Sequence, residues 1–492
     1  MSRAYSRTAI PALLLVAALA GSLAAERLAR AAEKPAAPVP TAPSLPSLPA
    51  GATPLPPALA ARMQDLRRAA EEYRGLRFQR EVPAVALGGR ALRKVTAQEF
   101  AEELPPERMR SLAAALKAFG FVPEDLDVGR YYPELVASQQ AAFYDPDRKY
   151  LAVVELGAWG REAGRGPAGG KNQRQGLDKA LGPDLARRTE EAVLVHELTH
   201  ALDDQSFDLN RLGKTLPLAD GGAALLGLIE GDATVTMIDY MMQTRVEELP
   251  AFGDTLGSLM RDPGALASLS PDMPGSKEMA AAPAWFRDTL LFSYFQGFAF
   301  CLDVRRQGGQ KLLDYAFAHD PPRSSEQLLH PEKWYGKRDD PMAIAWPDLG
   351  AELPGYEKTA DGDLGEEGIA ILLRQDLKDR DQAATAAAGW GGDRFAVYQK
   401  GARRLLLWIT DWDTETDAAE FQAAAARLGP DWQATRSAPN RVVVIRAQGG
   451  ELGGPECAAV EPKLAAAKAE KPANRDIDLQ ALGIPHKKPA AT

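Results

Sequence analysis

Two histidines and a glutamate are spaced so that they could act together on a metal ion: His196, Glu197 and His200. An α-helix turns about 100° per residue, so residues four apart project from one face, one turn apart. Glu197 would lie at the edge of that face. Two neutral imidazoles at this spacing fill two corners of a tetrahedral zinc site, which leaves Glu197 to act as a base on a metal-bound water.

The helix that carries these residues is predicted to span residues 190–205 and to be buried. Apolar residues occur nearly all round it, among them Val193, Leu194, Leu198 and Leu202, which is typical of a helix enclosed by other elements. Burying three polar side chains there without partners would cost several kcal/mol. A bound metal ion would remove most of that cost, so the sequence predicts a zinc site.

A second apolar helix, predicted over residues 223–246, offers the third ligand. Glu230 lies in its middle and could reach the metal if this helix packs across the first. Gly231 and Ala233 are small enough to let the two helices approach closely. We therefore expect Glu230 to complete the site. The alternatives for this ligand are Asp232, His319 and His330.

Further polar residues could support such a site. Asp203 and Asp204 end the first helix, where acidic groups oppose the macrodipole. They either orient a ligand imidazole through its second nitrogen or lie in solvent. His330, after a short helix that starts at Ser324, is our candidate for stabilising an oxyanion, and a surface role is its alternative. Its rivals for the oxyanion role are Tyr240, Tyr294 and Tyr335.

The composition excludes some classes of partner. The chain has 492 residues, 45% hydrophobic and 25% charged, which is ordinary for a globular protein of two or three domains. A net charge of −9 argues against nucleic acid or anionic membrane as a partner, because both favour clustered Lys and Arg. Cys301 and Cys457 are the two cysteines, and a disulfide and unpaired buried thiols both stay open.

The first residues have the features of an export signal. Arg3 and Arg7 precede an apolar stretch, residues 9–20, that is too short to span a bilayer comfortably. We expect a signal peptide over residues 1–25 and a periplasmic or secreted protein, with an uncleaved membrane anchor as the alternative. Residues 26–57 then form a linker rich in Pro and Ala. No later stretch is expected to cross a membrane.

Two segments resemble the gluzincin family of zinc metallopeptidases: residues 196–205, HELTHALDDQ, and residues 228–234, LIEGDAT. They are more closely similar to a group of exported bacterial and archaeal proteins predicted to be such peptidases. That group also shows blocks similar to residues 321–334 and 389–394. The resemblance implies a zincin-like fold around the metal helix.

By this resemblance His196, His200 and Glu230 would bind zinc, and Glu197 would be the general base. One position departs from the pattern. Thermolysin-like members place an acid four residues after the ligand Glu to steady a ligand histidine, whereas this chain has Thr234 there. The resemblance then requires that support to come from Asp232, Asp203 or Asp204, or leaves the site less tightly held.

We expect an α+β fold in two parts. A mainly helical zincin-like domain with a small sheet would cover residues 58–378, and a small ββαβ subdomain residues 379–455. Residues 140–155 predict a β-hairpin. It is either an edge that binds the substrate as an added strand or an ordinary core hairpin. A mobile surface loop is expected over residues 157–182 and a disordered tail over residues 456–492.

The predicted function is zinc-dependent hydrolysis of a peptide or protein substrate. Zinc would lower the pKa of its bound water to about 7, and Glu197 would take that proton as the water attacks the scissile carbonyl. The alternative is a non-catalytic exported binding or structural module. A structural zinc site has four protein ligands and needs no adjacent carboxylate, so Glu197 favours the enzyme. A self-processing enzyme kept inactive by its own N-terminal segment is a third possibility.

Overall fold

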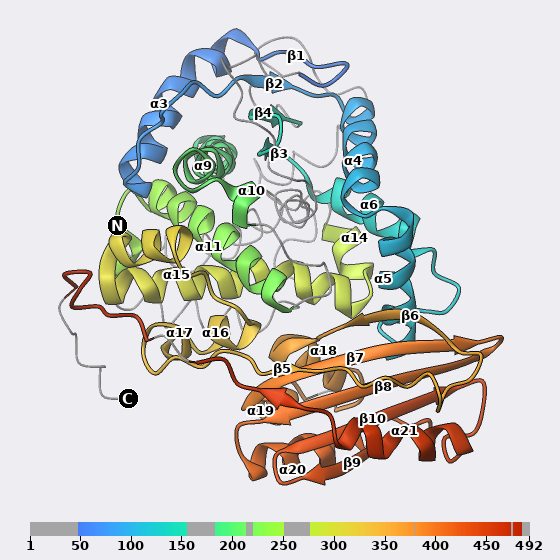
Figure 1. Cartoon of the computed structure of the whole chain (residues 1–492). Coiled ribbons are helices and arrows are strands. Elements are labelled where there is room, and N and C mark those ends of the chain that lie inside the picture. The colour runs from blue at the N-terminus through green and yellow to red at the C-terminus, as the bar shows by residue number, and fades with distance from the viewer. Residues whose placement is uncertain are drawn as a thin grey trace, which may run out of the picture.

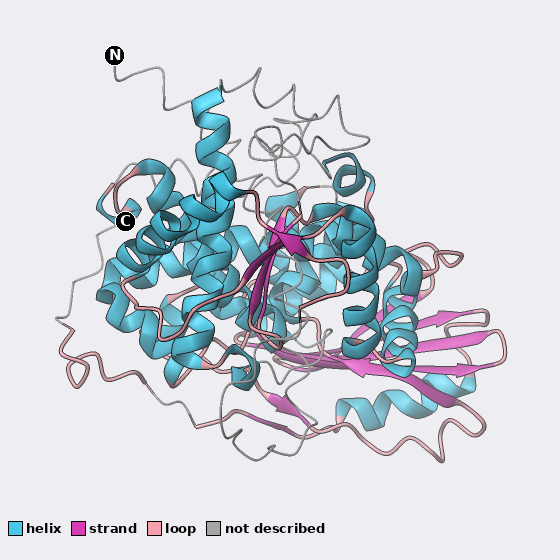
Figure 2. Cartoon of the chain, turned by 90° about the horizontal axis from the view of Figure 1, so that it is seen from above, coloured by secondary structure: helices cyan, strands magenta, loops and turns pink. Residues whose placement is uncertain are grey.

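The computed structural model describes residues 48–154, 183–212, 220–249, 276–377, 379–473 and 476–484. The fold is α+β, as the sequence predicts: a mainly helical part with a small sheet precedes a larger antiparallel sheet (Figures 1 and 2). The expected signal peptide, most of the linker and the loop over residues 157–182 lie outside the described residues.

Long helices form the frame of the first part. They are α3 (Pro57–Arg74), α9 (Pro183–Phe207), α11 (Asp220–Met242) and α15 (Ala284–Ala318). Helices α9 and α11 were expected from their apolar patterns, although α9 begins seven residues before its predicted start. Helix α15 has a kink at Gly309, whose φ is 64°, and further helical turns follow the kink.

Shorter elements cover this frame. The helices are α4 (Gly89–Glu103), α5 (Pro106–Phe119), α6 (Val128–Gln139), α10 (Leu209–Leu212), η2 (Val246–Glu248), α14 (Ser276–Ala281), α16 (Ser325–Leu329) and α17 (Glu332–Tyr335). The strands are β1 (Thr53–Pro54), β2 (Ala84–Ala86), β3 (Ala142–Asp145) and β4 (Tyr150–Val153), in the order β1-β2-β4-β3. The expected hairpin is confirmed, because β3 and β4 pair antiparallel, and β3 is the edge strand.

Helix α11 has the length and apolar composition of a membrane-spanning helix. It is the one helix of this kind within the described ranges, and 78% of its apolar window is buried inside the protein. From the sequence, no segment after the predicted export signal was expected to cross a membrane. The apolar residues of α11 pack in the protein core instead. Figure 1 shows α11 lying between α9 and α15.

Glycines let α11 and α15 cross with their backbones in contact. A Cβ atom added at Gly231 would lie 2.2 Å from the carbonyl carbon of Gly297, and one added at Gly297 would lie 2.1 Å from the carbonyl oxygen of Gly227. Real Cβ atoms do not approach other atoms so closely. From the sequence, Gly231 was expected at the contact between α9 and α11. This was wrong, because Gly231 faces α15.

We predict that Gly231→Ala lowers the free energy of unfolding by about 3 kcal/mol, because the added methyl group meets the backbone of α15, which cannot yield as a side chain can. The measurement is chemical denaturation of the full chain. Gly89→Ala in α4 is the control: the nearest atom to its new Cβ is the end of the Arg93 side chain, 3.8 Å away. Equal stability of the two variants would contradict the close crossing.

The larger sheet has five strands in the order β6-β7-β8-β10-β9, all antiparallel. They are β6 (Glu357–Gly362), β7 (Trp390–Lys400), β8 (Arg403–Trp412), β9 (Trp432–Ala438) and β10 (Arg441–Gln448). Helices α18 (Gly365–Leu377), α19 (Arg380–Ala387) and α20 (Glu415–Ala425) share a core with one face. This core contains four tryptophans: Trp390, Trp408, Trp412 and Trp432.

The predicted ββαβ unit was incomplete in two ways. Strand β9 was missed because only Trp432 in it is buried, so the alternation of apolar residues that identifies a strand is absent. Strand β6 pairs with β7 although it precedes residue 379, so the subdomain begins before the predicted boundary. Sheet pairing between distant segments determined that boundary.

The tail is ordered over much of its described length, contrary to the prediction of disorder from residue 456. Helix α21 (Pro455–Ala465) buries Cys457, Val460 and Leu464 against the second face of the larger sheet. Strand β11 (Ala469–Glu470) then pairs with β5 (Ala343–Ile344). Cys457 lies in this core and Cys301 in the α11–α15 core, so the two thiols are not paired.

Buried carboxyl groups meet where the larger sheet joins the helical part. Asp363, just before α18, accepts a hydrogen bond from the backbone N–H of Asp220 at the start of α11. Asp393 on β7 accepts hydrogen bonds from the indole N–H groups of Trp390 and Trp408, at 3.0 and 2.8 Å. Burial and the nearby charge of Asp393 raise the pKa of Asp363 to about 7.

We predict that Asp363→Asn stabilises the protein at pH 8 by a few degrees in Tm and changes it little at pH 4. The folded state holds a proton on Asp363 that the unfolded chain releases near pH 4, so this contribution is full below pH 4 and is lost as the pH rises through 7. Asn mimics the protonated group. Thermal unfolding at both pH values measures the effect, and Asp361→Asn, at a half-exposed neighbour, is the control.

Candidate metal centre

His196 and His200 face one another across one turn of α9. Their Nε2 atoms are 3.0 Å apart, and the two rings meet edge to face with centroids 4.6 Å apart. Both side chains are fully buried, because α3, α11 and β3 pack around this helix. The predicted helix, its burial and the shared face of the two histidines are therefore all present.

Glu230 brings a carboxylate from α11 to the same point. Its Oε2 atom lies 3.1 Å from Nε2 of His196 and 3.5 Å from Nε2 of His200. Ligand atoms of the three side chains all lie within 4.8 Å of one another. Among the alternatives for the third ligand, Asp232 pairs with Arg74, His330 bonds Glu366, and His319 stacks on Tyr315.

The arrangement fits a tetrahedral metal ion. With metal–ligand bonds of about 2.0–2.1 Å, the ligand atoms of a zinc site lie about 3.3 Å apart, close to the three distances observed here. Glu230 Oε1 has no hydrogen-bond partner among the described residues. Polar groups buried in this way are costly unless something binds them. The three side chains therefore form a group that could hold a metal ion.

The protonation states also suit a metal. Burial opposes ionisation of Glu230, but the charges and hydrogen bonds of His200 and His196 outweigh it and lower the pKa of Glu230 to about 2. Burial is the main cause that lowers the pKa of His196 below its ordinary value. Near neutral pH the site accordingly has a carboxylate and a neutral imidazole, the forms that bind metal.

Glu197 lies beside this group and is oriented by the edge strand. The backbone N–H of Tyr144 on β3 donates to Glu197 Oε2 at 2.8 Å. Tyr144 lies opposite Leu151 in the hairpin, and Val154 N–H bonds the carbonyl of Ala141, three residues before Tyr144. In an antiparallel pair this alternation turns the N–H of Tyr144 away from β4 and towards α9.

The acids that end α9 do not contact the imidazoles. Asp204, seven residues after Glu197 and so on the same face, accepts from the hydroxyl of Tyr144 at 2.8 Å and from Lys149 at 2.7 Å. Asp203 and Asp232 both pair with Arg74. Within the described ranges no hydrogen bond joins these acids to either ring, and all three are buried. Of the two alternatives left open for Asp203 and Asp204, neither a bond to an imidazole nor exposure to solvent is present.

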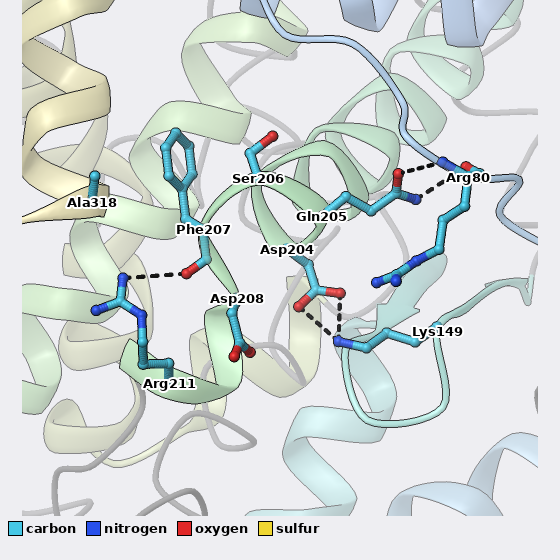
Figure 3. Close-up of a pocket in the computed structure, with 9 residues that line it drawn as sticks. All are labelled: Arg80, Lys149, Asp204, Gln205, Ser206, Phe207, Asp208, Arg211 and Ala318. Carbon is cyan, nitrogen blue, oxygen red and sulfur yellow. Dashed lines mark hydrogen bonds and ion pairs between the residues drawn. The ribbon is translucent and has the colours of Figure 1, made fainter. Parts of the chain in front are cut away.

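A pocket of about 560 Å³ opens beyond the end of α9. Figure 3 shows Lys149 reaching Asp204 from the β3–β4 turn, with Arg80 beside them and Asp208 and Arg211 further along. The metal-binding group does not line this pocket. Tyr144 connects the two places, because its backbone bonds Glu197 and its hydroxyl bonds Asp204.

Of the residues considered for the oxyanion, only Tyr294 lies at the metal group. Its ring, on α15, stacks on that of His196 with centroids 6.1 Å apart. His330 instead bonds Glu366 of α18 at 3.0 Å. The other two tyrosines bond elsewhere: Tyr240 to Glu191 and Tyr335 to Asp303.

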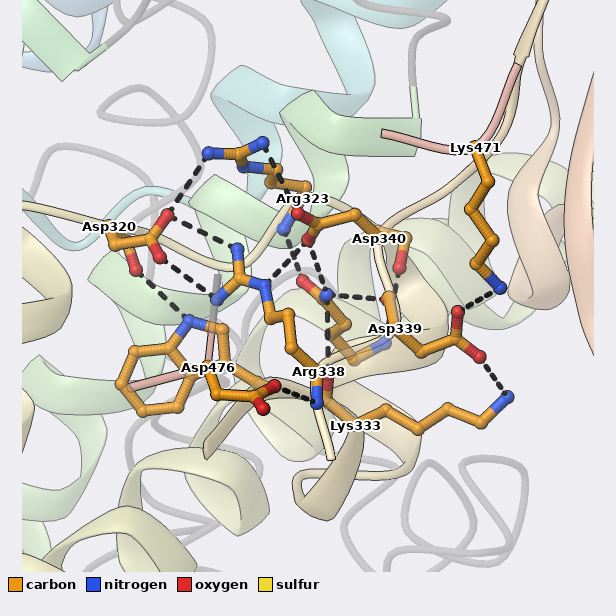
Figure 4. Close-up of polar contacts among 11 residues, drawn as sticks. Asp320, Arg323, Lys333, Arg338, Asp339, Asp340, Lys471 and Asp476 are labelled. Carbon is orange, nitrogen blue, oxygen red and sulfur yellow. Dashed lines mark hydrogen bonds and ion pairs between the residues drawn. The ribbon is translucent and has the colours of Figure 1, made fainter. Parts of the chain in front are cut away.

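The block of residues 321–334 forms a polar scaffold. Arg338 is fully buried and pairs with Asp320 and Asp340, and Asp340 also accepts from Gln327 at 3.0 Å (Figure 4). A second group of acids, Glu326, Asp339 and Asp413, surrounds the ammonium group of Lys333. Lys471 also pairs with Asp339 and Asp413. Because two lysines already occupy these acids, we assign them to the scaffold that positions α16.

Comparison with known proteins matches one part of the chain. Residues 353–458 match a family described as a domain of unknown function, DUF8575. No curated protein and no solved structure matches the chain. The matched segment contains the larger sheet and lies outside the metal group.

We predict that the purified protein binds one zinc ion and that Glu230→Gln or His200→Ala removes it, since each change leaves only two ligands. Metal content after dialysis measures this, together with the rise in Tm on adding zinc. The control is His319→Ala, a histidine at the end of α15 outside the group. Zinc retained by both ligand variants would refute the assignment.

Proposed function

We propose that this protein is an exported zinc metallopeptidase in which His196, His200 and Glu230 bind zinc and Glu197 is the general base. The observation that carries the proposal is the convergence of His196, His200 and Glu230 from α9 and α11, with ligand atoms 3.0–3.5 Å apart. Glu197 is next to His196 in the helix and is also buried. Three protein ligands leave a fourth position for water or substrate, as catalytic zinc sites require.

A zinc ion supplies two things when bound: it makes water acidic enough to lose a proton near neutral pH, and it polarises a carbonyl. The protein's own residues would do the rest. Glu197 would accept the proton of the attacking water on its carboxylate and pass it to the leaving amine. The hydrogen bond from the Tyr144 N–H fixes the orientation of that carboxylate.

Tyr294 takes the place of His330 in this proposal. Its ring lies against His196 in the buried centre, whereas His330 is engaged by Glu366. A hydroxyl donor beside the reacting carbonyl stabilises the negative charge that develops on oxygen, and such donors contribute several kcal/mol in low-dielectric sites.

The edge of β3 would bind the substrate as an extra strand. Ala142 shares the orientation of Tyr144, with its backbone N–H and carbonyl turned away from β4. The two residues are therefore on the side that faces α9, and an extended peptide aligned there would lie beside Glu197.

One observation favours the second candidate, a metal-binding module without turnover. His196 and His200 are 0% exposed and Glu197 is 1% exposed, so within the described residues the centre is enclosed. A structural metal site is closed in this way, whereas a peptidase must admit a substrate.

The decisive variant is Glu197→Gln. If Glu197 is the base, hydrolysis of a mixed peptide library should fall by about 10²–10⁴-fold while one zinc ion stays bound, because the amide keeps the shape but accepts no proton. Product analysis by mass spectrometry and metal content are measured on the same samples. Undiminished hydrolysis by this variant would exclude Glu197, and zinc binding by the parent without any hydrolysis would favour the module.

Two further variants, Tyr294→Phe and His330→Ala, are measured in the same assay. They show which side chain donates the hydrogen bond that stabilises the oxyanion. We expect the loss of the Tyr294 hydroxyl to lower kcat by about 10²-fold and to leave the zinc content unchanged. His330→Ala should keep kcat within about threefold of the parent. The reverse ranking would restore His330 to the role that the sequence suggested.

A further inference from the structure

A fully buried arginine joins the two helices that carry the metal group. Arg74 is the last residue of α3, and its Nε lies 2.9 Å from Asp203 on α9 and 2.5 Å from Asp232 on α11. Its Nη1 also pairs with Asp314 on α15 at 2.7 Å. Asp203 follows His200 by three residues and Asp232 follows Glu230 by two, so the arginine connects the two sides of the site.

Helix α3 runs alongside α9 in a fixed register. Arg62 pairs with Glu191 and Arg74 with Asp203, the same separation of 129 residues in both cases. The two pairs are twelve residues apart, about 18 Å along the helix, and the metal motif lies between them. Arg62 also donates to the hydroxyl of Tyr240 of α11 at 3.4 Å, and this hydroxyl donates to Glu191 at 2.6 Å. Helix α3 is thus attached to both metal-site helices at both ends.

The chemistry of the Arg74 contact requires a guanidinium group. Its Nε donates to Asp203 and its Nη1 to Asp314 in fixed directions, and Asp232 pairs with the same Nε by charge. An ammonium group acts only as a point charge. The rings of Phe207 and Phe317, stacked on one another, lie 5.7 and 5.6 Å from the central carbon of the guanidinium, and the arginine is 0% exposed. In such surroundings the position of the arginine determines where Asp203 and Asp232 lie.

We propose that Arg74 is a positioning residue for the metal centre: by binding Asp203 and Asp232 it fixes Glu230 at the distance from His196 and His200 that one metal ion requires. The inference rests on the proposed metal site and adds a residue from a third helix to it. Arg74 supplies no ligand atom. Its contribution is to hold two helices in register, as residues outside the ligand set do in other metal sites.

The test compares Arg74→Lys and Arg74→Met with Arg305→Met in the full chain. Arg305 is a matched control, because it is also fully buried, and it pairs with Asp239 of α11 and with Glu247, nine or more residues from Glu230. All three variants should lower Tm. Only the Arg74 variants should weaken zinc binding, by about 10–100-fold in competition with a chelator, and alter the visible absorption spectrum of the cobalt-loaded protein, which reports ligand geometry.

Arg74→Lys keeps the buried positive charge. It therefore provides the measurement if Arg74→Met does not fold. Zinc affinity of Arg74→Lys within twofold of the parent, with an unchanged cobalt spectrum, would overturn the inference and leave the metal site standing. The same loss of affinity in Arg305→Met would also overturn it, because general destabilisation would then explain the effect. Absence of zinc binding in the parent would instead refute the proposed site and, with it, this role of Arg74.

Discussion

Burial of charged and polar groups between packed helices is the constraint on which the structure depends. Unpaired polar groups inside a protein cost about 1–3 kcal/mol each in mutational measurements. Helices α9 and α11 carry several of them at their contact, in two clusters. One cluster contains two imidazoles and a carboxylate, and the other contains Arg74 with its acids. Both must be satisfied in the same packing, so the helix register has little freedom.

The remainder of the fold limits how these helices can move. Glycines at residues 227, 231 and 297 bring the backbones of α11 and α15 into contact, so that side of α11 cannot shift without opening the core. On the other side, β3 is tied to α9 at two places, through Tyr144 to Glu197 and to Asp204. The metal group therefore lies between a rigid helix crossing and the edge of a small sheet.

The larger sheet has a different relation to the metal group. It shares its polar junction with the start of α11, through Asp220 and Asp363, and it carries the segment that matches a known family. The scaffold around Arg338 links α16 to this region (Figure 4). Because α16 packs on α11 through Leu328 and Gly227, the sheet supports the helix that carries Glu230 without contributing a residue to the metal group.

The sequence by itself determined what is local. The spacing of His196 and His200, the apolar pattern of α9 and α11 and the turn between β3 and β4 all follow from periodicities of 3.6 and 2 residues. These patterns placed both histidines on one face and identified Glu230 as the third member of the group. They also predicted an α+β fold, because helical and strand patterns occupy different parts of the chain.

Only the tertiary structure decided which distant residues meet. Arg74 and Tyr144 were not candidates from the sequence, and Tyr294 was one of several for the oxyanion role. Asp203 and Asp232, whose roles the sequence left open, pair with Arg74. Strands β6 and β9 and helix α21 likewise join the larger sheet through pairing and burial with remote segments. The physical reason is common to all of these cases. A periodicity fixes the face on which a side chain lies, whereas its partner depends on how whole elements pack.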